Sequence, residues 1–171
     1  LSAGKMNLSL STIKVDSFIE TCGQTFSSAC SAKEIQFSIH RNPEHAPPAL
    51  IQGNVDALEK VVFNYLSNAL KFTPNDGRIE IGTIADHDFV KVFVTDTGPG
   101  ISPERRQELF DVFAKATSAT SRQYEGSGLG LALAREMTEA MSGVVGVETK
   151  LGEGSTFWAR FPRTKSSVGS S

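Results

Sequence analysis

The sequence predicts an α/β fold of the α+β kind, a two-layer sandwich in which a mixed β-sheet is covered on one face by helices. The chain of 171 residues carries segments with a helical period and segments with strand-like alternation, and such a mixture is typical of this architecture. A hydrophobic content of 39% suffices for one core, so we expect one main domain. In chain order, the expected elements are a helix at 15–29, a strand at 35–40, an extended piece near 50–51, a helix around 58–71, strands near 78–84 and 89–95, a short helix after 102–103, a helix at 129–141 and strands at 144–149 and 155–161.

Apolar spacing and turn residues justify these elements. The first helix has its apolar residues on one face, at Val15, Phe18, Ile19, Cys22, Phe26 and Ala29. Alternation of Ile35, Phe37 and Ile39 indicates the strand that follows. The Asn-Asp-Gly turn at 75–77 opens the next two strands. In the second half, Ser102-Pro103 provides an N-cap and a first-turn proline, Gly143 is a stop for the last helix, and the glycine-containing stretch 150–154 joins the final two strands as a hairpin.

Charge and composition exclude several classes of protein. The formal net charge of -2 gives no electrostatic basis for binding nucleic acid or a membrane surface. No apolar run approaches the roughly 18 residues of a membrane span, and no signal peptide is visible. Cys22 and Cys30 lie about 12 Å apart along one predicted helix, too far to bridge. We therefore expect a cytoplasmic location for this part of the protein, with both thiols reduced.

The first motif with chemical meaning is Asn64-Tyr-Leu-Ser-Asn68-Ala-Leu-Lys71-Phe72. A helical period places Asn64, Asn68 and Lys71 on one face of an otherwise apolar helix. Amide oxygens suit Mg²⁺, which takes its remaining ligands from water and from substrate phosphates, and a lysine adds a positive charge for those phosphates. An isolated pair of this kind is more often a solvent-facing polar stripe, so its interpretation depends on the motifs that follow.

The second motif, Asp96-Thr-Gly98-Pro-Gly100, ends a predicted apolar strand. A carboxylate in this position can accept a hydrogen bond from an exocyclic amine, while the two glycines permit positive φ and close approach of the backbone. The alternative is an ordinary turn rich in Asp and Gly.

The third motif, Gly126-Ser-Gly128-Leu-Gly130-Leu, opens the last helix, where free N–H groups and the positive end of the helix dipole favour an anion. No strand immediately precedes these glycines, which argues against a Rossmann dinucleotide fold.

Together with Leu109-Phe110-Asp-Val-Phe113, these motifs resemble the N, G1, F and G2 boxes of the ATP-binding domain of sensor histidine kinases, in the GHKL ATPase superfamily. The four boxes occur in the family's order and span residues from about 54 to 161. The resemblance implies the Bergerat ATP-binding fold. The first residues also resemble the end of the helical dimerisation domain that normally precedes the catalytic domain. We therefore expect three segments: residues 1–14 as the end of that helix and a linker, 15–163 as the catalytic domain, and 164–171 as a flexible tail.

The resemblance assigns roles to particular residues, with ATP and Mg²⁺ as the cofactors. It implies that Asn68 coordinates Mg²⁺, that Asn64 supports the metal and phosphates, and that Lys71 contacts phosphate, so that these three form the catalytic set. Asp96 would hydrogen-bond the adenine amino group, and Phe72 stands where the family most often has a tyrosine against the adenine. Further nucleotide contacts are implied at Gly98, Gly100, Ile101, Gly126, Ser127, Gly128, Leu129, Gly130 and Leu131.

The segment between Phe113 and Gly126 corresponds to the family's mobile ATP lid. Its two cations, Lys115 and Arg122, are candidates for the γ-phosphate, although they could equally be solvated surface charges.

Two absences indicate transfer of the phosphoryl group to an external acceptor. Hydrolytic relatives such as gyrase, MutL and Hsp90 carry a glutamate where this chain has Asn64, and an amide cannot act as their general base. None of His40, His45 and His87 has the sequence setting of the family's phosphorylated histidine. The sequence therefore predicts the catalytic fragment of a protein-histidine kinase whose acceptor lies on a dimerisation domain outside this chain.

The expected partners are that dimerisation domain and, downstream, a response regulator receiver domain, in a parent that is a homodimer; contact with nucleic acid or directly with a membrane is not expected. Two alternatives stay open. One is a degenerate nucleotide-binding signalling module without transfer activity, and the other is a GHKL ATPase.

Overall fold

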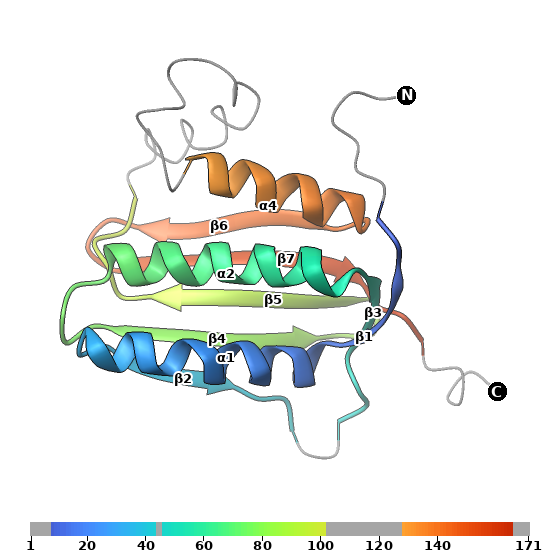
Figure 1. Ribbon diagram of the computed structural model, residues 1–171, viewed down its shortest axis with the longest axis horizontal. Coiled ribbons are helices and arrows are strands. Elements are labelled where there is room, and N and C mark those ends of the chain that lie inside the picture. Colours follow the sequence, from blue (N-terminus) through green and yellow to red (C-terminus); the bar gives the residue numbers. More distant parts are fainter. Residues whose placement is uncertain (1–7, 44–45, 102–127, 166–171) are drawn as a thin grey trace.

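The computed structural model describes residues 8–43, 46–101 and 128–165 (Figure 1). Its elements in chain order are β1 (Ser11–Lys14), α1 (Val15–Ala32), β2 (Gln36–His40), β3 (Leu50–Gly53), α2 (Val55–Phe72), β4 (Arg78–Ala85), β5 (Phe89–Asp96), α4 (Gly128–Ala140), β6 (Val144–Lys150) and β7 (Gly154–Pro162). The short helix expected after Ser102-Pro103 and the F box fall outside the described residues.

Five strands form one mixed sheet in the order β2-β4-β5-β7-β6. The pairing of β2 with β4 is parallel, and the other three pairings are antiparallel. Helices α1, α2 and α4 lie side by side on one face of this sheet (Figure 1). The structure thus confirms the two-layer sandwich that the mixture of periods predicts.

The core lies between these two layers. Alternate residues of the central strand β5, Val90, Val92 and Val94, are buried toward the helices, where they join Leu58 and Leu66 of α2 in one apolar cluster. The register that pairs Val94 with Phe157 of β7 continues the buried face across the sheet.

Within the N-terminal segment, for which we expect a helix end and a linker, a short strand precedes α1. Residues Ser11–Lys14 form strand β1, which pairs antiparallel with β3 in a second, two-stranded sheet. Ile13 is buried opposite Ile51. This strand was missed because it has only one buried residue, and its stability comes from pairing with a segment about 40 residues away, which no local pattern reveals.

The second helix begins at a well-defined cap. Asn54 accepts a hydrogen bond from the backbone N–H of Ala57 (3.0 Å), and its amide donates to the carbonyl of Ser9 (3.0 Å). The cap therefore fixes the start of α2 and also ties it to the chain just before β1.

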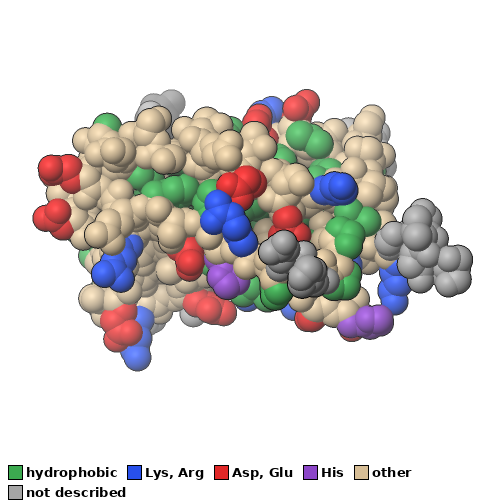
Figure 2. Space-filling view, turned by 90° about the horizontal axis from the view of Figure 1, so that it is seen from below, with side chains coloured by type: hydrophobic (Ala, Val, Ile, Leu, Met, Phe, Trp, Pro, Cys, Tyr) green, Lys and Arg blue, Asp and Glu red, His purple; other side chains and the backbone are tan. Residues whose placement is uncertain are grey.

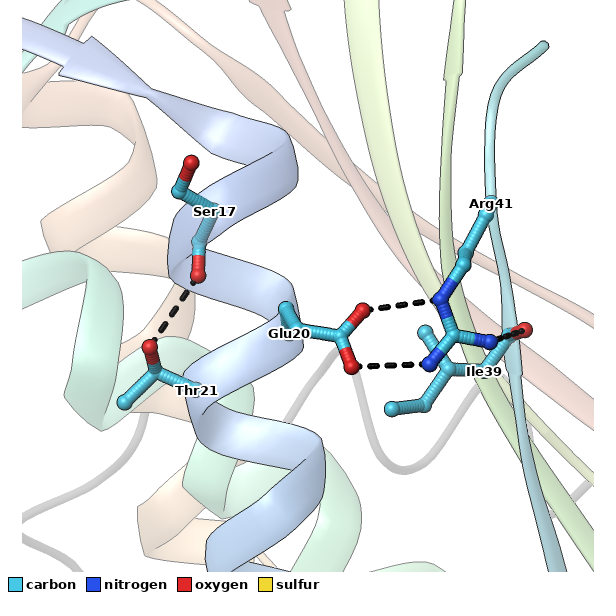
Figure 3. A network of polar contacts seen from close by, with 5 residues as sticks. All are labelled: Ser17, Glu20, Thr21, Ile39 and Arg41. Carbon is cyan, nitrogen blue, oxygen red and sulfur yellow. Dashed lines mark hydrogen bonds and ion pairs between the residues drawn. The ribbon is translucent and has the colours of Figure 1, made fainter. Parts of the chain in front are cut away.

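The edge strand β2 is joined to α1 by polar contacts on the surface. Arg41, which follows β2, donates two hydrogen bonds to the carboxylate of Glu20, at 2.9 and 2.7 Å (Figure 3). Hydrogen bonding to Arg41 holds the pKa of Glu20 below its ordinary value. Figure 2 shows the face below α1 and β2 of Figure 1, where acidic, basic and apolar side chains are interspersed and no single kind forms a continuous patch.

Cys22 and Cys30 are free and buried in α1. Burial, together with the charge of Glu59, raises the pKa of Cys22 to about 12, so this thiol stays protonated and unreactive at neutral pH. Among the described helices, none combines the length and apolar character needed to cross a bilayer.

Candidate functional site

The polar face of α2 contains a buried amide. The side chain of Asn68 is only 3% exposed, yet it has no hydrogen-bond partner among the residues that the structure describes. Neither amide atom of Asn68 is among the fully buried polar atoms that lack a partner in the described residues, so solvent still reaches this amide. Its oxygen is therefore available for a ligand.

The first and third sequence motifs meet where α2 packs against α4. A Cβ atom built on Gly130 would lie 2.5 Å from Nδ2 and 2.7 Å from Oδ1 of Asn64. At these distances a methyl group would fit only if the Asn64 amide moved, so the start of α4 lies directly against that amide. Leu131, the next residue, is 5% exposed and belongs to the core.

The second motif lies at the end of β5, next to the last turn of α2. Asp96 is 6% exposed, and its Oδ1 accepts a hydrogen bond from the backbone N–H of Gly98 (2.8 Å). Burial raises the pKa of Asp96, while the backbone N–H groups of Gly98 and Ser155 oppose this shift. A Cβ atom on Gly98 would lie 3.1 Å from the carbonyl oxygen of Phe72. The carboxylate is thus desolvated, held in one orientation, and adjacent to the end of α2.

The last two residues of α2 are exposed beside this carboxylate. Phe72 is 46% exposed, although it is a large apolar side chain. The ammonium of Lys71 lies 5.4 Å from the centroid of the Phe72 ring. An exposed aromatic ring and a cation next to a buried carboxylate can contact the flat face of a base and an anionic group, respectively.

The glycine loop after Asp96 is attached to the hairpin between β6 and β7. Gly100 has a φ of 76°, and a Cβ atom there would lie 2.2 Å from the carbonyl oxygen of Lys150. The backbone N–H of Ile101 donates to the hydroxyl of Thr149 (2.8 Å), and that of Gly152 donates to the carbonyl of Pro99 (2.8 Å). These contacts hold the glycine loop in place against the hairpin between β6 and β7.

Thr149 and Ser155 are site residues that the sequence reasoning missed. Their hydroxyl groups lie 2.8 Å apart, Thr149 accepts from the loop, and the Ser155 backbone faces Asp96. A Cβ atom on Gly154 would lie only 2.0 Å from the carbonyl oxygen of Asp96. The sequence has a hydroxyl residue on each side of Gly152 and Gly154, but taken alone this stretch indicates only a hairpin turn.

Several predicted site residues cannot be placed. Lys115, Arg122, Gly126 and Ser127 lie outside the described residues. Gly128 and Leu129 begin α4.

Comparison with known proteins identifies the family of this chain. Residues 53–165 match the family of histidine kinase-, DNA gyrase B- and HSP90-like ATPases. This range includes α2, the glycine loop and α4, so it covers all the contacts described above. The chain belongs to this ATPase family.

Within the family, the relatives of this chain are sensor histidine kinases. It is 32% identical over 173 residues to the autoinducer 2 sensor kinase/phosphatase LuxQ of Vibrio vulnificus, covering 96% of this chain and 20% of LuxQ. It is 34% identical over 168 residues to the peroxide stress-activated histidine kinase mak2 of Schizosaccharomyces pombe, covering 92% of this chain and 7% of mak2. The chain thus spans a fifth or less of the length of these relatives.

Solved structures of histidine kinases have a similar fold. The crystal structure of full-length ShkA in complex with AMPPNP superimposes with a TM-score of 0.77 at 29% identity, covering 94% of this chain and 32% of ShkA. The nucleotide-free catalytic domain of the histidine kinase ThkA, at 22% identity and a TM-score of 0.74, shares the fold; it covers 92% of this chain and 97% of that domain. These findings confirm the predicted Bergerat fold and the assignment to the catalytic domains of sensor histidine kinases.

Proposed function

We propose that this domain binds Mg²⁺·ATP and transfers the γ-phosphate to a histidine on the dimerisation domain of its parent kinase. The observation that carries the proposal is the convergence of three separate motifs around the C-terminal half of α2. Gly130 contacts Asn64, and Gly98 contacts the end of the helix at Phe72 beside Asp96. The similar structure of full-length ShkA, which was solved in complex with AMPPNP, supports nucleotide binding by this domain.

The end of the site at Asp96 suits an adenine base. The backbone N–H groups of Gly98 and Ser155 hold the carboxylate, and its two oxygens have lone pairs left that can accept a hydrogen bond from the exocyclic amine. A guanine base carries a carbonyl oxygen there, which would face the carboxylate and be repelled. Phe72 can cover one face of the base. This arrangement predicts a preference for ATP over GTP.

The other end of the proposed site, around Asn64 and Asn68, suits a metal ion that is bound to phosphates. The unpartnered amide of Asn68 offers a neutral oxygen that fits Mg²⁺, with Asn64 one helical turn before it. Lys71 adds a positive charge, and the glycines that open α4 present the positive end of that helix. Mg²⁺ would supply neutralisation of the phosphate charge when bound. The protein residues orient the nucleotide and hold the metal.

Transfer is favoured over hydrolysis by Asn64. In the transfer, the bond between the β- and γ-phosphates breaks, a phosphorus–nitrogen bond forms to the acceptor imidazole, and ADP leaves. An amide packed against Gly130 cannot take a proton from water, so the geometry offers no base at this position for hydrolysis. Lys115 and Arg122 are proposed γ-phosphate contacts.

The wider assignments are proposals too. We propose that residues 1–14 contain the end of the preceding dimerisation helix and a linker, that the parent is a cytoplasmically facing homodimer, and that a receiver domain takes the phosphoryl group from the histidine. Relatives named as hybrid signal transduction histidine kinases support such a multi-domain parent. Residues 164–171 are proposed as a flexible tail, although Thr164 itself donates a hydrogen bond to the carbonyl of Leu50 (2.8 Å).

One experiment separates the transferase from its alternatives. The purified fragment is titrated with Mg²⁺·ATP by calorimetry and then mixed with a helical hairpin that carries the parent's acceptor histidine. We expect binding, little steady-state hydrolysis, and slow formation of an acid-labile phosphohistidine on the hairpin. Rapid phosphate release by the fragment alone would indicate an ATPase, and binding without transfer to a competent hairpin would indicate a signalling module.

The role of Asn68 has its own test. Asn68→Ala should remove most of the Mg²⁺ dependence of ATP binding, because the metal loses its amide ligand. The fold should persist, because the side chain has no hydrogen-bond partner among the described residues to lose. A magnesium titration identical to that of the wild type would show that this amide does not bind the metal.

A further inference from the structure

Lys33 reaches from the end of α1 to the end of α2. Its ammonium group donates to the backbone carbonyl of Leu70 and lies 3.5 Å from that of Lys71. Both helices end at the same side of the sandwich (Figure 1). A lysine that follows one helix in the sequence is therefore bound to the last turn of another.

The sequence explains why this carbonyl needs an external donor. In a continuing helix, the carbonyl of Leu70 would accept from the N–H of residue 74, but that residue is Pro74, which has no N–H. The negative end of the helix dipole also lies here. Lys33 supplies both a hydrogen-bond donor and a compensating positive charge.

The contact is part of a larger junction between the turns that follow the two helices. The backbone N–H of Asp76 donates to the carbonyl of Glu34 (2.9 Å), and that of Gln36 donates to the carbonyl of Gly77 (2.9 Å). Glu34 and Asp76 both have positive φ, at 60° and 69°. These turns are held in one particular conformation, and the end of α2 is held with them.

The last turn of α2 is also the part of the helix that borders the proposed nucleotide. It carries Lys71 and Phe72, and the carbonyl of Phe72 is the group that approaches Gly98 beside Asp96. We propose that Lys33 is a positioning residue for the nucleotide pocket. By binding the carbonyls of this turn, it fixes Phe72 against the base and Lys71 against the phosphates. This inference rests on the proposed function.

The test compares three variants by calorimetry with Mg²⁺·ATP, at a temperature where all are folded. Lys33→Met keeps the aliphatic stem but removes the donor and charge, and Lys33→Arg restores both. Lys60→Met is the matched control, because it removes the same charge from an exposed position on α2. We expect Lys33→Met to weaken binding about fivefold, Lys33→Arg to recover most of the loss, and Lys60→Met to bind like the wild type.

A second measurement separates positioning from general stabilisation. Lys33→Met is combined with Phe72→Ala, and the loss of affinity caused by Lys33→Met is measured in both backgrounds. If Lys33 acts through the last turn, its effect should be clearly smaller once Phe72 is truncated. An undiminished effect in that background would overturn the proposal.

The remaining outcomes are equally decisive. If Lys33→Met is less stable to urea but binds nucleotide like the wild type, Lys33 is only a helix cap and the proposal fails. Equal weakening by Lys33→Met and Lys60→Met would assign the effect to overall charge and would also overturn it. If the wild type itself does not bind Mg²⁺·ATP, the proposed function fails, which is a separate result visible before any variant is compared.

Discussion

Two polar regions of this domain differ in how completely the protein satisfies them. On the surface of α1, the Glu20 carboxylate receives two hydrogen bonds from Arg41, and both side chains remain in contact with water. At the end of α2 and β5, Asn68 and Asp96 are buried, and Asn68 has no partner within the described part of the chain. Burial raises the pKa of Asp96, and a desolvated carboxylate beside an exposed aromatic ring and a cation is typical of a binding site. The satisfied surface pair indicates only local structure.

Among the tests of this difference between the two regions, Asp96→Ala should have the largest effect on nucleotide affinity. The variant loses the only buried carboxylate of the described site, and a hydrogen bond to a charged group contributes about 1.5–3 kcal/mol. Binding of ATP should therefore weaken by roughly tenfold to more than a hundredfold, as measured by calorimetry. The wild type should also discriminate strongly against GTP. Equal affinities of the wild type for ATP and GTP would contradict the role of Asp96 in recognising the base.

Gly130→Ala should have the next largest effect. The new methyl group would lie 2.5 Å from Nδ2 of Asn64, so the amide must move away from the start of α4. Overpacking of this kind costs about 1–3 kcal/mol, and we expect roughly tenfold weaker binding of Mg²⁺·ATP in a folded protein. Glu136→Ala is the control, because this residue is exposed on the same helix. Unchanged affinity of Gly130→Ala would mean that the contact with Asn64 has no role in the site.

Lowering the pH should have a smaller effect on adenine affinity. Burial raises the pKa of Asp96, so this carboxyl gains its proton at a higher pH than an ordinary aspartate. The protonated form no longer accepts a hydrogen bond as a carboxylate, and adenine affinity should fall as the pH is lowered through this raised pKa. Adenosine is the suitable probe, because it has no phosphate that titrates in the same range, and its affinity can be followed by NMR titration.

The folding stability of the nucleotide-free domain should rise as the pH falls, opposite to the change in adenine affinity. Because the folded state holds this proton more tightly than the unfolded chain does, the contribution of Asp96 to folding becomes more favourable as the pH falls through the raised pKa. Adenosine affinity that stays flat over this range would argue against an ionised Asp96 as the base-recognising group.

The smallest effect is expected from Glu20→Gln. The change weakens an exposed ion pair on α1, which contributes little in water. Nucleotide affinity should equal that of the wild type, with at most a slight decrease in the melting temperature. A clear loss of affinity would show that the surface pair is coupled to the site and would remove the contrast between the two regions.

The sequence predicted much of this molecule because the relevant signals are local. Periodicity located the helices that became α1, α2 and α4, and Gly130 lies next to Asn64, as the order of the motifs led us to expect. A common site with Asp96 stays a prediction. The contributions of Thr149 and Ser155 were not predictable in the same way. They depend on β7 pairing with β5, which sets Asp96 opposite Ser155. Strand order and register are long-range properties. The sequence of a hairpin does not indicate which other strand will pair with it.

The two-stranded sheet of β1 and β3 has a mechanical consequence. The chain enters the domain along β1, and near its other end Thr164 hydrogen-bonds to Leu50, so both connections are anchored on the short strand β3 just before α2. The nucleotide end of α2 lies 18 residues further on, about 27 Å away at the rise of an α-helix. Both described connections therefore meet the domain at the end opposite to Phe72. Because α2 is packed against β5 and α4, a force applied through either connection would be transmitted to the domain as one body, and not to this helix alone.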